Sequence, residues 1–405
     1  EYLERDPSSA GNRKLFTTSM WVKRTEIGQA STIFGVQPAS SGSDANTFQF
    51  GFTSGDKFQC GLQTFYALQS NRLFRDTSAW YHIVVAVDTT QSTAANRIKL
   101  YVNGVQETSF SIQATITQDS DLGINFTEPH RIGTLLSNSW YFSGYIAEMN
   151  HIDGQTLTPT DFGEFDSDTG IWKPKAYAGS YGTNGFYLDF ESSGSLGADS
   201  SGNSNNFTLN NITSADQATD TPTNNFCTLN PLMTNAGSTN YLTVTEGGTK
   251  GVNAAAAYKI SNSSIGLSSG KWYWEVKATD VNGVTAIGVT MPNYWDADYT
   301  LQGCIYYAQG PQRYNNASAS SFGSGYSDGD IISFALDMDA TPPTMEVYKN
   351  NSSEGNLMAG LSINGTGGAF LPEKKDFYFP KIVGYNANTF ECNFGGYTSF
   401  SISSA

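Results

Sequence analysis

The stretch WYHIVVAVDTTQSTAANRIKLYVNGVQETSFSI, residues 80–112, decides the fold class of this chain. Trp80 to Asp88 alternates apolar and polar side chains around a more apolar middle, which predicts a central β-strand. Arg97 to Asn103 predicts a second strand, and Asn103-Gly104 is the strongest short signal for a hairpin turn. Val105 to Ile112 is predicted as the returning strand. The stretch therefore indicates antiparallel β-structure.

The same rhythm of short strands and polar turns extends through the first half of the chain. Alternation or apolar runs predict further strands at Leu15 to Lys23, His130 to Thr134, Tyr141 to Ile152 and Gly185 to Glu191. A short apolar run from Phe207 to Ile212 predicts a closing strand. The one helical turn is expected at Thr158 to Phe162, where a Thr cap precedes Pro and an acidic residue.

The second half begins a new series of strands after a segment rich in Ser, Asn, Asp and Thr. In Lys271 to Ala278 (KWYWEVKA), Trp272, Trp274 and Val276 fall on one face of the predicted strand. Further strands are predicted at Ala286 to Met291, Ile331 to Met338, Met345 to Lys349, Tyr378 to Val383 and Phe390 to Phe394.

Length and composition agree with two domains of one class. A chain of 405 residues with 41 Gly, 25 Phe and 22 Tyr suits thin, aromatic-filled sandwiches joined by many turns. The prediction is an all-β protein of two tandem antiparallel β-sandwiches. The first sandwich spans residues 1–212, a Ser/Asn/Thr-rich linker spans 213–239, and the second sandwich spans 240–405.

The charge balance argues against two classes of partner. With 22 Lys and Arg against 37 Asp and Glu, the net charge is -15, whereas nucleic-acid binding needs clustered basic residues. The sequence has no apolar stretch near the ~18 residues that span a bilayer, so membrane insertion is not expected. No signal peptide is visible at Glu1, although the presence of a segment upstream of Glu1 stays open.

The four cysteines, Cys60, Cys227, Cys304 and Cys392, are sparse and follow no disulfide or zinc spacing. Three of them lie inside strand-like runs, where a thiol behaves as a small hydrophobic side chain. Free buried thiols are therefore predicted, which suits folding in a reducing cytosol.

Two series of motifs resemble known families. The runs FTTSMWVKR, AWYHIVVAVD, IKLYVNGV and HRIGTLLSNSWYFSGYIAEMNHIDGQTLTPTDF are similar, in this order and spacing, to a laminin-G-type, concanavalin A-like sandwich. The runs GKWYWEVKA, AIGVT, DGDIISFALDMDATPPTMEVYKNN and FYFPKIVGYNANTFECNFG resemble a SPRY domain. Their pairing is similar to fibre and decoration proteins of marine bacteriophages.

This resemblance implies a non-enzymatic structural and adhesion protein on the virion surface, synthesised in the host cytoplasm. Its expected partners are other virion proteins, further copies of itself, and a glycan or protein of the host surface. A secreted or cell-surface bacterial lectin and a polysaccharide-degrading enzyme remain as alternatives. The step from fold to function is an analogy, because one fold hosts many functions.

The enzyme alternative has few residues to support it. A retaining glycosidase needs two carboxylates ~5–5.5 Å apart. The nearest carboxylate groupings are Glu164, Asp166 and Asp168 in GEFDSDTG, and Asp337 with Asp339 in LDMD; loop and turn roles are favoured for both. The only histidines, His82, His130 and His151, are irregularly spaced and have no nucleophile-elbow context, so structural roles are favoured for them as well.

A structural calcium ion is the one cofactor that the resemblance leaves open. Laminin-G-type domains often hold calcium at the rim of the sandwich. Asp119 and Asp121 form one Asp-rich loop, and Asp166 and Asp168 form another, with the oxygen ligands that calcium prefers. Neither loop matches a complete calcium motif, and exposed turn residues are the favoured interpretation.

Two aromatic clusters are candidate binding sites, because aromatic faces stack on sugars and anchor protein interfaces. Trp140 and Tyr141 precede Phe142 in the first domain, where the start of a buried strand is the favoured interpretation. Tyr294, Trp295 and Tyr299 lie in a predicted loop of the second domain. In SPRY domains such a loop usually belongs to the partner-binding surface.

Overall fold

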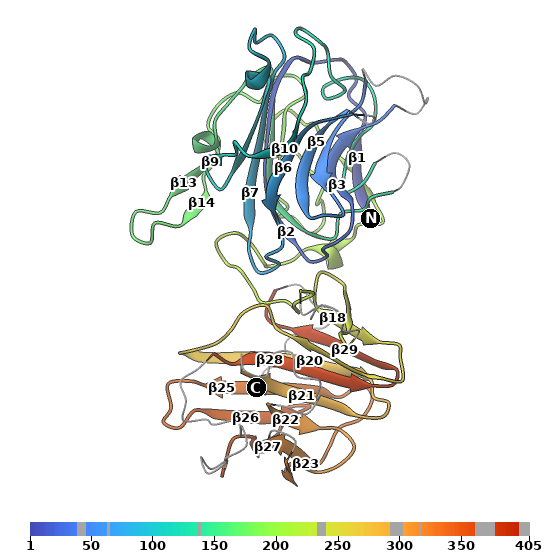
Figure 1. The fold of residues 1–405 in the computed structure, drawn as a ribbon, viewed down its shortest axis with the longest axis vertical. Helices are drawn as coiled ribbons and strands as arrows, with labels where there is room; N and C mark the ends of the chain where they lie inside the picture. Colours follow the sequence, from blue (N-terminus) through green and yellow to red (C-terminus); the bar gives the residue numbers. More distant parts are fainter. Residues whose placement is uncertain are drawn as a thin grey trace. The chain divides into compact units, whose positions relative to one another are not determined.

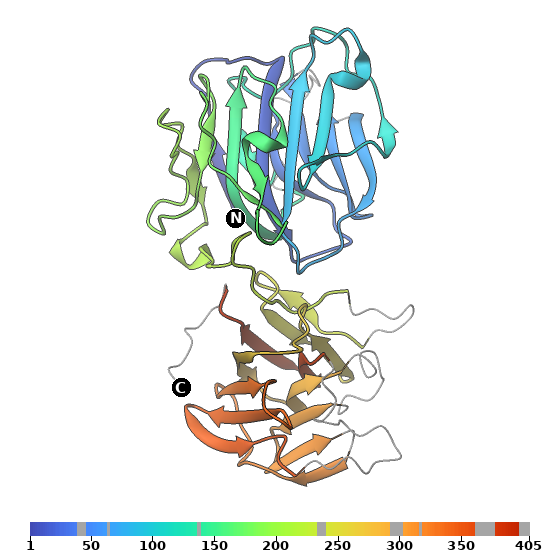
Figure 2. The ribbon, with the colours of Figure 1, turned by 90° about the vertical axis from the view of Figure 1, so that its left-hand side faces the viewer.

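The computed structural model describes residues 1–38, 46–62, 65–135, 139–232, 240–291, 303–315, 318–360 and 377–396. The chain divides into two compact units, residues 1–225 and 226–405, and both consist of β-strands (Figures 1 and 2). The described ranges contain no α-helix, and their 3-10 helices are too short to cross a membrane. The all-β prediction is confirmed.

Unit 1 is a sandwich of two antiparallel sheets. In hydrogen-bonded order the eight-stranded sheet contains β10 (Phe110–Gln113), β6 (Phe65–Leu73), β5 (Lys57–Leu62), β4 (Phe48–Phe52), β3 (Ser31–Val36), β11 (His130–Ile132), β1 (Tyr2–Arg5) and β16 (Thr208–Asn210). The six-stranded sheet contains β15 (Phe186–Leu188), β12 (Gly144–Asp153), β2 (Leu15–Arg24), β7 (Tyr81–Asp88), β8 (Ile98–Val102) and β9 (Val105–Gln106). Strand β7 is central, as predicted, and β16, within the predicted closing strand, lies at the edge of its sheet.

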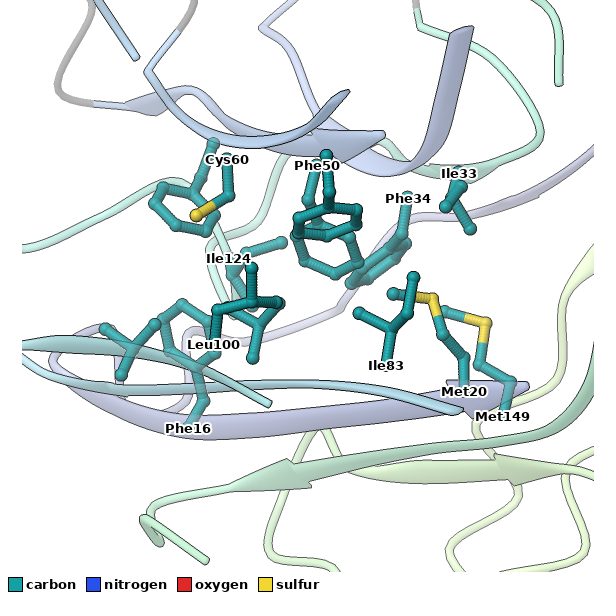
Figure 3. Close-up of a cluster of buried hydrophobic side chains, with 14 of the residues drawn as sticks. Phe16, Met20, Ile33, Phe34, Phe50, Cys60, Ile83, Leu100, Ile124 and Met149 are labelled. Atoms are coloured by element: carbon teal, nitrogen blue, oxygen red, sulfur yellow. The ribbon is translucent and has the colours of Figure 1, made fainter. Parts of the chain in front are cut away.

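The core of unit 1 lies between these sheets (Figure 3). Phe34 and Phe50 from the larger sheet meet Met20, Ile83 and other apolar residues from the smaller one, all at 0–1% exposure. Aromatic rings contact edge to face, for example Phe34 and Phe50 with centroids 5.5 Å apart. The period-two alternation of the strands thus supplies one apolar face per sheet.

The six-stranded sheet is covered on its outer face as well. The alternation in β2 predicts that Thr17, Ser19 and Lys23 face solvent, but all three have 0% exposure. The segment after β12 packs over this face and places Leu157, Phe162, Tyr177 and Tyr181 against Val84 and Ile152. This segment contains the predicted helical turn, η3 (Pro159–Asp161), which Thr158 and Asp161 cap reciprocally. The sequence alone therefore did not reveal this second layer.

The hairpin predicted at Asn103-Gly104 is confirmed. Both residues have positive φ values, 49° and 81°, as a tight hairpin turn requires. The returning strand is shorter than predicted, because β9 ends at Gln106 and the chain then crosses to the other sheet. There β10 pairs with β6, so the predicted strand Val105 to Ile112 is divided between the two sheets.

The first part of the segment predicted as a linker belongs to unit 1. Residues 213–225 pack on unit 1 through the 3-10 helix η4 (Ser214–Asp216) and through Asp220, which is 5% exposed. The Asp220 carboxylate accepts hydrogen bonds from Lys23 Nζ at 2.6 Å and Trp80 Nε1 at 2.8 Å. The units divide after Asn225, within the predicted linker of residues 213–239.

Unit 2 is built from two further antiparallel sheets. The seven-stranded sheet contains β17 (Thr243–Thr245), β18 (Lys250–Asn253), β29 (Asn388–Asn393), β20 (Lys271–Asp280), β25 (Ile331–Asp337), β26 (Thr344–Lys349) and β27 (Ser352–Asn356). The six-stranded sheet contains β19 (Tyr258–Asn262), β28 (Phe379–Tyr385), β21 (Thr285–Thr290), β22 (Cys304–Tyr307), β23 (Gln312–Asn315) and β24 (Ser318–Ser321).

The core of unit 2 confirms the predicted orientation of Trp274 and Val276, which are both 2% exposed. The Trp274 ring stacks on Phe334 of the neighbouring strand, with centroids 5.1 Å apart. Trp272 shares the same strand face but lies at the strand end and is 46% exposed. All four cysteines of the protein are free, and Cys60, Cys304 and Cys392 are buried, as predicted.

Short strand pairings also join segments of unit 1 that are remote in the sequence. An example is the pairing of β1 with both β11 and β16. Two short strands from opposite ends of the unit thus lie beside each other.

Replacing Asp220 by Ala tests the attachment of residues 213–225. The variant leaves the Lys23 ammonium buried without its carboxylate, and we expect a loss of about 3–5 kcal/mol of unfolding free energy. Urea denaturation measures this loss. Asp216→Ala, a capping variant in the same segment, is the control and is expected to lose about 1 kcal/mol. Equal losses in both variants would contradict the role assigned to the ion pair.

Candidate functional site

Trp140 and Tyr141, here called the aromatic pair, lie on the surface of unit 1. Their exposed fractions are 42% and 44%, and β12 begins only at Gly144, so the favoured prediction of a buried strand start was wrong. Trp140 has a φ of 58°, and its carbonyl accepts a hydrogen bond of 2.7 Å from Thr32 N. The backbone is therefore fixed on β3 while both rings face outward.

Phe142, the third residue of this cluster, points the other way. It is half-buried against the core of unit 1, and its ring stacks near Phe52 with centroids 6.3 Å apart. Its N–H donates to the carbonyl of Gly133 at 2.9 Å. Phe142 thus anchors the segment that carries the aromatic pair. The second predicted cluster, Tyr294, Trp295 and Tyr299, lies outside the described residues.

A cleft of about 330 Å³ opens at one end of unit 1, and we call it the end cleft. It lies where β1 and β12 begin and where β11 and β15 end. Its floor is the end of the hydrophobic core, formed by Leu3, Ile132, Phe142, Ile146, Phe190 and Ile212. The floor therefore exposes partly buried apolar side chains to a ligand.

One wall of the end cleft is the segment 212–221, which is held in place at several points. Gln217 Nε2 donates hydrogen bonds of 2.8 Å to the carbonyls of Phe190 and Glu191. Asp220, at the end of the segment, forms the buried ion pair with Lys23. The wall is therefore formed before any ligand binds, which lowers the entropic cost of binding.

The end cleft has an acidic rim. Among the described residues, Glu1, Asp189, Glu191 and Asp216 line it, and no Lys, Arg or His does so. Just outside it, the pKa of Glu148 is raised, mainly by burial and further by the charges of Asp189 and Glu191. The Glu148 carboxylate accepts a hydrogen bond of 2.6 Å from the Tyr187 hydroxyl. The cleft thus combines an apolar floor with negative potential.

A second, polar recess of about 440 Å³ lies beside Arg5. The Arg5 guanidinium donates to Asn205 Oδ1 at 2.5 Å and to Asn184 Oδ1 at 3.2 Å. Burial lowers the pKa of Arg5, while nearby Asp199 and Asp153 oppose this effect. The guanidinium therefore holds strand β1 against the loop 199–206, and the recess contains no aromatic ring for stacking.

The Asp-rich loops form turns. Asp166 accepts hydrogen bonds from Asp168 N, Thr169 N and Lys173 Nζ, and these donors hold its pKa well below the usual range. Asp119 has a φ of 61°, and its N–H donates to the Thr89 carbonyl at 2.9 Å. In the part of the chain that the structure describes, no three His, Cys, Asp or Glu side chains group to hold a metal. Asp119, Asp121, Asp166 and Asp168 thus fit the turn interpretation.

The three histidines are buried at 0–2% exposure, and hydrogen bonds fix their neutral tautomers. Trp172 Nε1 donates to His82 Nδ1 at 3.0 Å, so His82 carries its proton on Nε2, facing Ser19 Oγ at 2.8 Å. This tautomer donates to Ser19 and cannot remove its proton. The pair is therefore not arranged for nucleophilic catalysis.

His130 and His151 share one buried network around Asn125. Asn125 N donates to His130 Nε2 at 3.0 Å, and His151 Nε2 lies 2.9 Å from Asn125 Oδ1. Burial lowers the pKa of His82 and of His130 to about 3, and it lowers the pKa of His151 well below its ordinary value. These rings connect strands and loops of the core.

The carboxylates considered for hydrolysis are also occupied in turns and ion pairs. Lys173 Nζ lies 3.6 Å from Glu164 and 3.1 Å from Asp166 on the hairpin of β13 (Gly163–Phe165) and β14 (Trp172–Pro174). Asp337 pairs with Lys271 at 3.0 Å and accepts from the backbone N–H of Asp339. These carboxylates therefore stabilise turns and paired strands.

Sequence reasoning missed the end cleft. Its lining comes from segments near residues 1–3, 132–146, 189–196 and 212–221, which no local pattern connects. The run Phe207 to Ile212 was the only signal, and it indicated a closing strand. The aromatic pair was identified as a candidate because consecutive aromatic residues are a local feature of the sequence, although their exposure was not predicted.

The first unit carries a match to a known family. Residues 3–161 match the family model of the concanavalin A-like lectin/glucanases superfamily. The match agrees with the motif resemblance predicted for this part of the chain. No curated protein matches the chain.

Several solved structures are similar to parts of this chain. The SPRY domain of human HERC1 is 18% identical, covers 37% of this chain and 91% of its own, and has a TM-score of 0.30. Another human SPRY domain is 18% identical, with coverages of 38% and 96% and a TM-score of 0.29. A heptameric SAP-like pentraxin from Limulus polyphemus is 17% identical, with coverages of 39% and 71% and a TM-score of 0.27.

The histidines predict how the stability of unit 1 depends on pH. Their folded pKa values lie below the unfolded value of about 6.5, so the unfolded state binds more protons as the pH falls. We expect each buried ring to lower the free energy of unfolding by about 2 kcal/mol when the pH falls from 7 to 5. Urea denaturation at both pH values measures this, with NMR titration of the ring protons as a direct check. Ring signals that titrate near pH 6 would contradict the neutral assignment.

Proposed function

We propose that this protein is a non-catalytic binding protein that holds a glycan through the aromatic pair of unit 1. The main support is that Trp140 and Tyr141 expose 42% and 44% of their surface although their backbone is fixed on the sandwich. Burial is the usual state of a large aromatic ring next to a core strand. Exposure of two consecutive rings therefore favours a contact role.

Stacking is the proposed mode of recognition. The apolar faces of a sugar ring pack on aromatic rings, and a rigid platform keeps the entropic cost of this contact low. A contact made by two rings is weak by itself. Several copies acting together would raise the avidity far above the affinity of a single site.

The proposal includes no turnover. Among the described residues, the histidines are buried as neutral rings, and the candidate carboxylates stabilise turns or pair with lysines. Bond cleavage by a sandwich of this class needs an acid and a base or nucleophile that face the substrate together. Binding is therefore the favoured activity.

We further propose that the protein is displayed on the surface of a virion as a fibre, decoration or host-recognition component. Its partners would be other virion proteins, further copies of itself and a host surface glycan or protein. The net charge of -15 suits a protein that must stay soluble at high local concentration. The motif resemblance to bacteriophage structural proteins supports this setting.

The aromatic pair is tested with Trp140→Ala and Tyr141→Ala on a glycan array. Each variant is expected to lose about tenfold or more in apparent affinity, because truncation removes a stacking face. Trp272→Ala is the matched control, since Trp272 is 46% exposed but lies in unit 2. Unchanged binding of both unit 1 variants, or equal losses in all three, would overturn the proposal.

The virion setting and the absence of turnover have separate tests. Antibody against the chain should label purified particles in electron microscopy, and absence of label would favour a secreted or cell-surface lectin. Incubation with bacterial capsule and algal glucans should release no reducing ends. Release that persists after purification would instead support the polysaccharide-degrading alternative.

A further inference from the structure

The end cleft differs in chemistry from the aromatic pair. Neither Trp140 nor Tyr141 lines it. Its floor includes Leu3 and Ile132, which are core residues at 3% exposure, together with half-buried rings such as Phe142. Covering the exposed parts of the half-buried side chains is favourable by about 25 cal/mol per Å² of apolar surface. The cleft therefore suits a ligand with apolar side chains.

The rim of the end cleft adds a charge requirement. Asp189, Glu191 and Asp216 line it and form no salt bridge within the described ranges. Asp220 also lines it, but Lys23 already neutralises this carboxylate at 2.6 Å. Walls of low dielectric strengthen the field of carboxylates that have no counter-ion nearby. A cationic ligand thus complements the rim.

Hydrogen-bonding capacity distinguishes a basic peptide from a neutral sugar. The rim carboxylates only accept hydrogen bonds, and the Gln217 amide already donates to two backbone carbonyls at 2.8 Å. Lysine and arginine side chains only donate. A neutral sugar gains nothing from the negative charge of the rim, although Tyr2, Tyr145 and Thr221 in the lining carry hydroxyls.

We propose that the end cleft docks a peptide segment of a protein partner that alternates basic and apolar residues. The apolar side chains cover the open end of the core, and the basic side chains reach Asp189, Glu191 and Asp216. The wall formed by residues 212–221 is held by the Lys23–Asp220 ion pair, so the site is preformed. This interaction is independent of glycan binding at the aromatic pair.

Fluorescence polarisation with the full chain tests the docking site. The probe is a labelled peptide of alternating lysine and leucine, compared with a glutamate–leucine and a lysine–serine peptide. Only the lysine–leucine peptide is expected to bind, and its affinity is expected to fall with added salt. Absence of binding, or equal binding of either comparison peptide, would overturn the proposal.

Charge-neutral variants locate the site. The double variant D189N/E191Q keeps the side-chain shapes and is expected to weaken peptide binding about tenfold. The control D119N/D121N removes two acids outside the cleft and is expected to change affinity less than about twofold. Equal effects of the two double variants would mean that binding depends only on the net charge of the protein, and this would contradict a binding site in the end cleft.

Two further outcomes separate this proposal from the proposed function. The variants Trp140→Ala and Tyr141→Ala should leave the affinity for the lysine–leucine peptide unchanged, whatever they do to glycan binding. A neutral oligosaccharide should not displace the peptide. Displacement by such an oligosaccharide would assign the end cleft to a sugar and overturn the peptide proposal.

Discussion

Burial of both faces of the six-stranded sheet is the constraint on which unit 1 depends. Strand β2 carries Phe16, Met20 and Val22 into the core, while Thr17, Ser19 and Lys23 face the other way and are equally buried. Each outward polar group then needs a partner, since an unpaired buried polar group costs several kcal/mol. His82 supplies the partner for Ser19, and Asp220 supplies it for Lys23.

The same constraint explains why the end cleft lies at an end of the sandwich. The segment after β12 covers part of the outer face, and residues 213–225 cover the part near Lys23 and Trp80. Neither covering segment closes the gap between the two sheets where β1 and β12 begin. The end cleft is this gap, with the core as its floor and the covering segment as one wall.

The burial of the histidines follows from the same arrangement and bears on function. Two of the three rings face the core or the outer cover from the six-stranded sheet, and all three are fixed as neutral donors and acceptors. A ring held in this way stabilises the fold but does not exchange protons with a substrate. The described surface of unit 1 offers groups for contact with a ligand: exposed aromatic rings, and an apolar cleft with carboxylates.

The sequence by itself determined the strands, the hairpin at Asn103-Gly104 and the capped turn at Thr158, because each depends on neighbours within a few residues. It also placed Trp140 and Tyr141 as candidates, though not their exposure. Only the tertiary structure decided the second cover of the six-stranded sheet, the assignment of residues 213–225 to unit 1 and the end cleft. These features depend on contacts such as Lys23 with Asp220, 197 positions apart, which no local periodicity records.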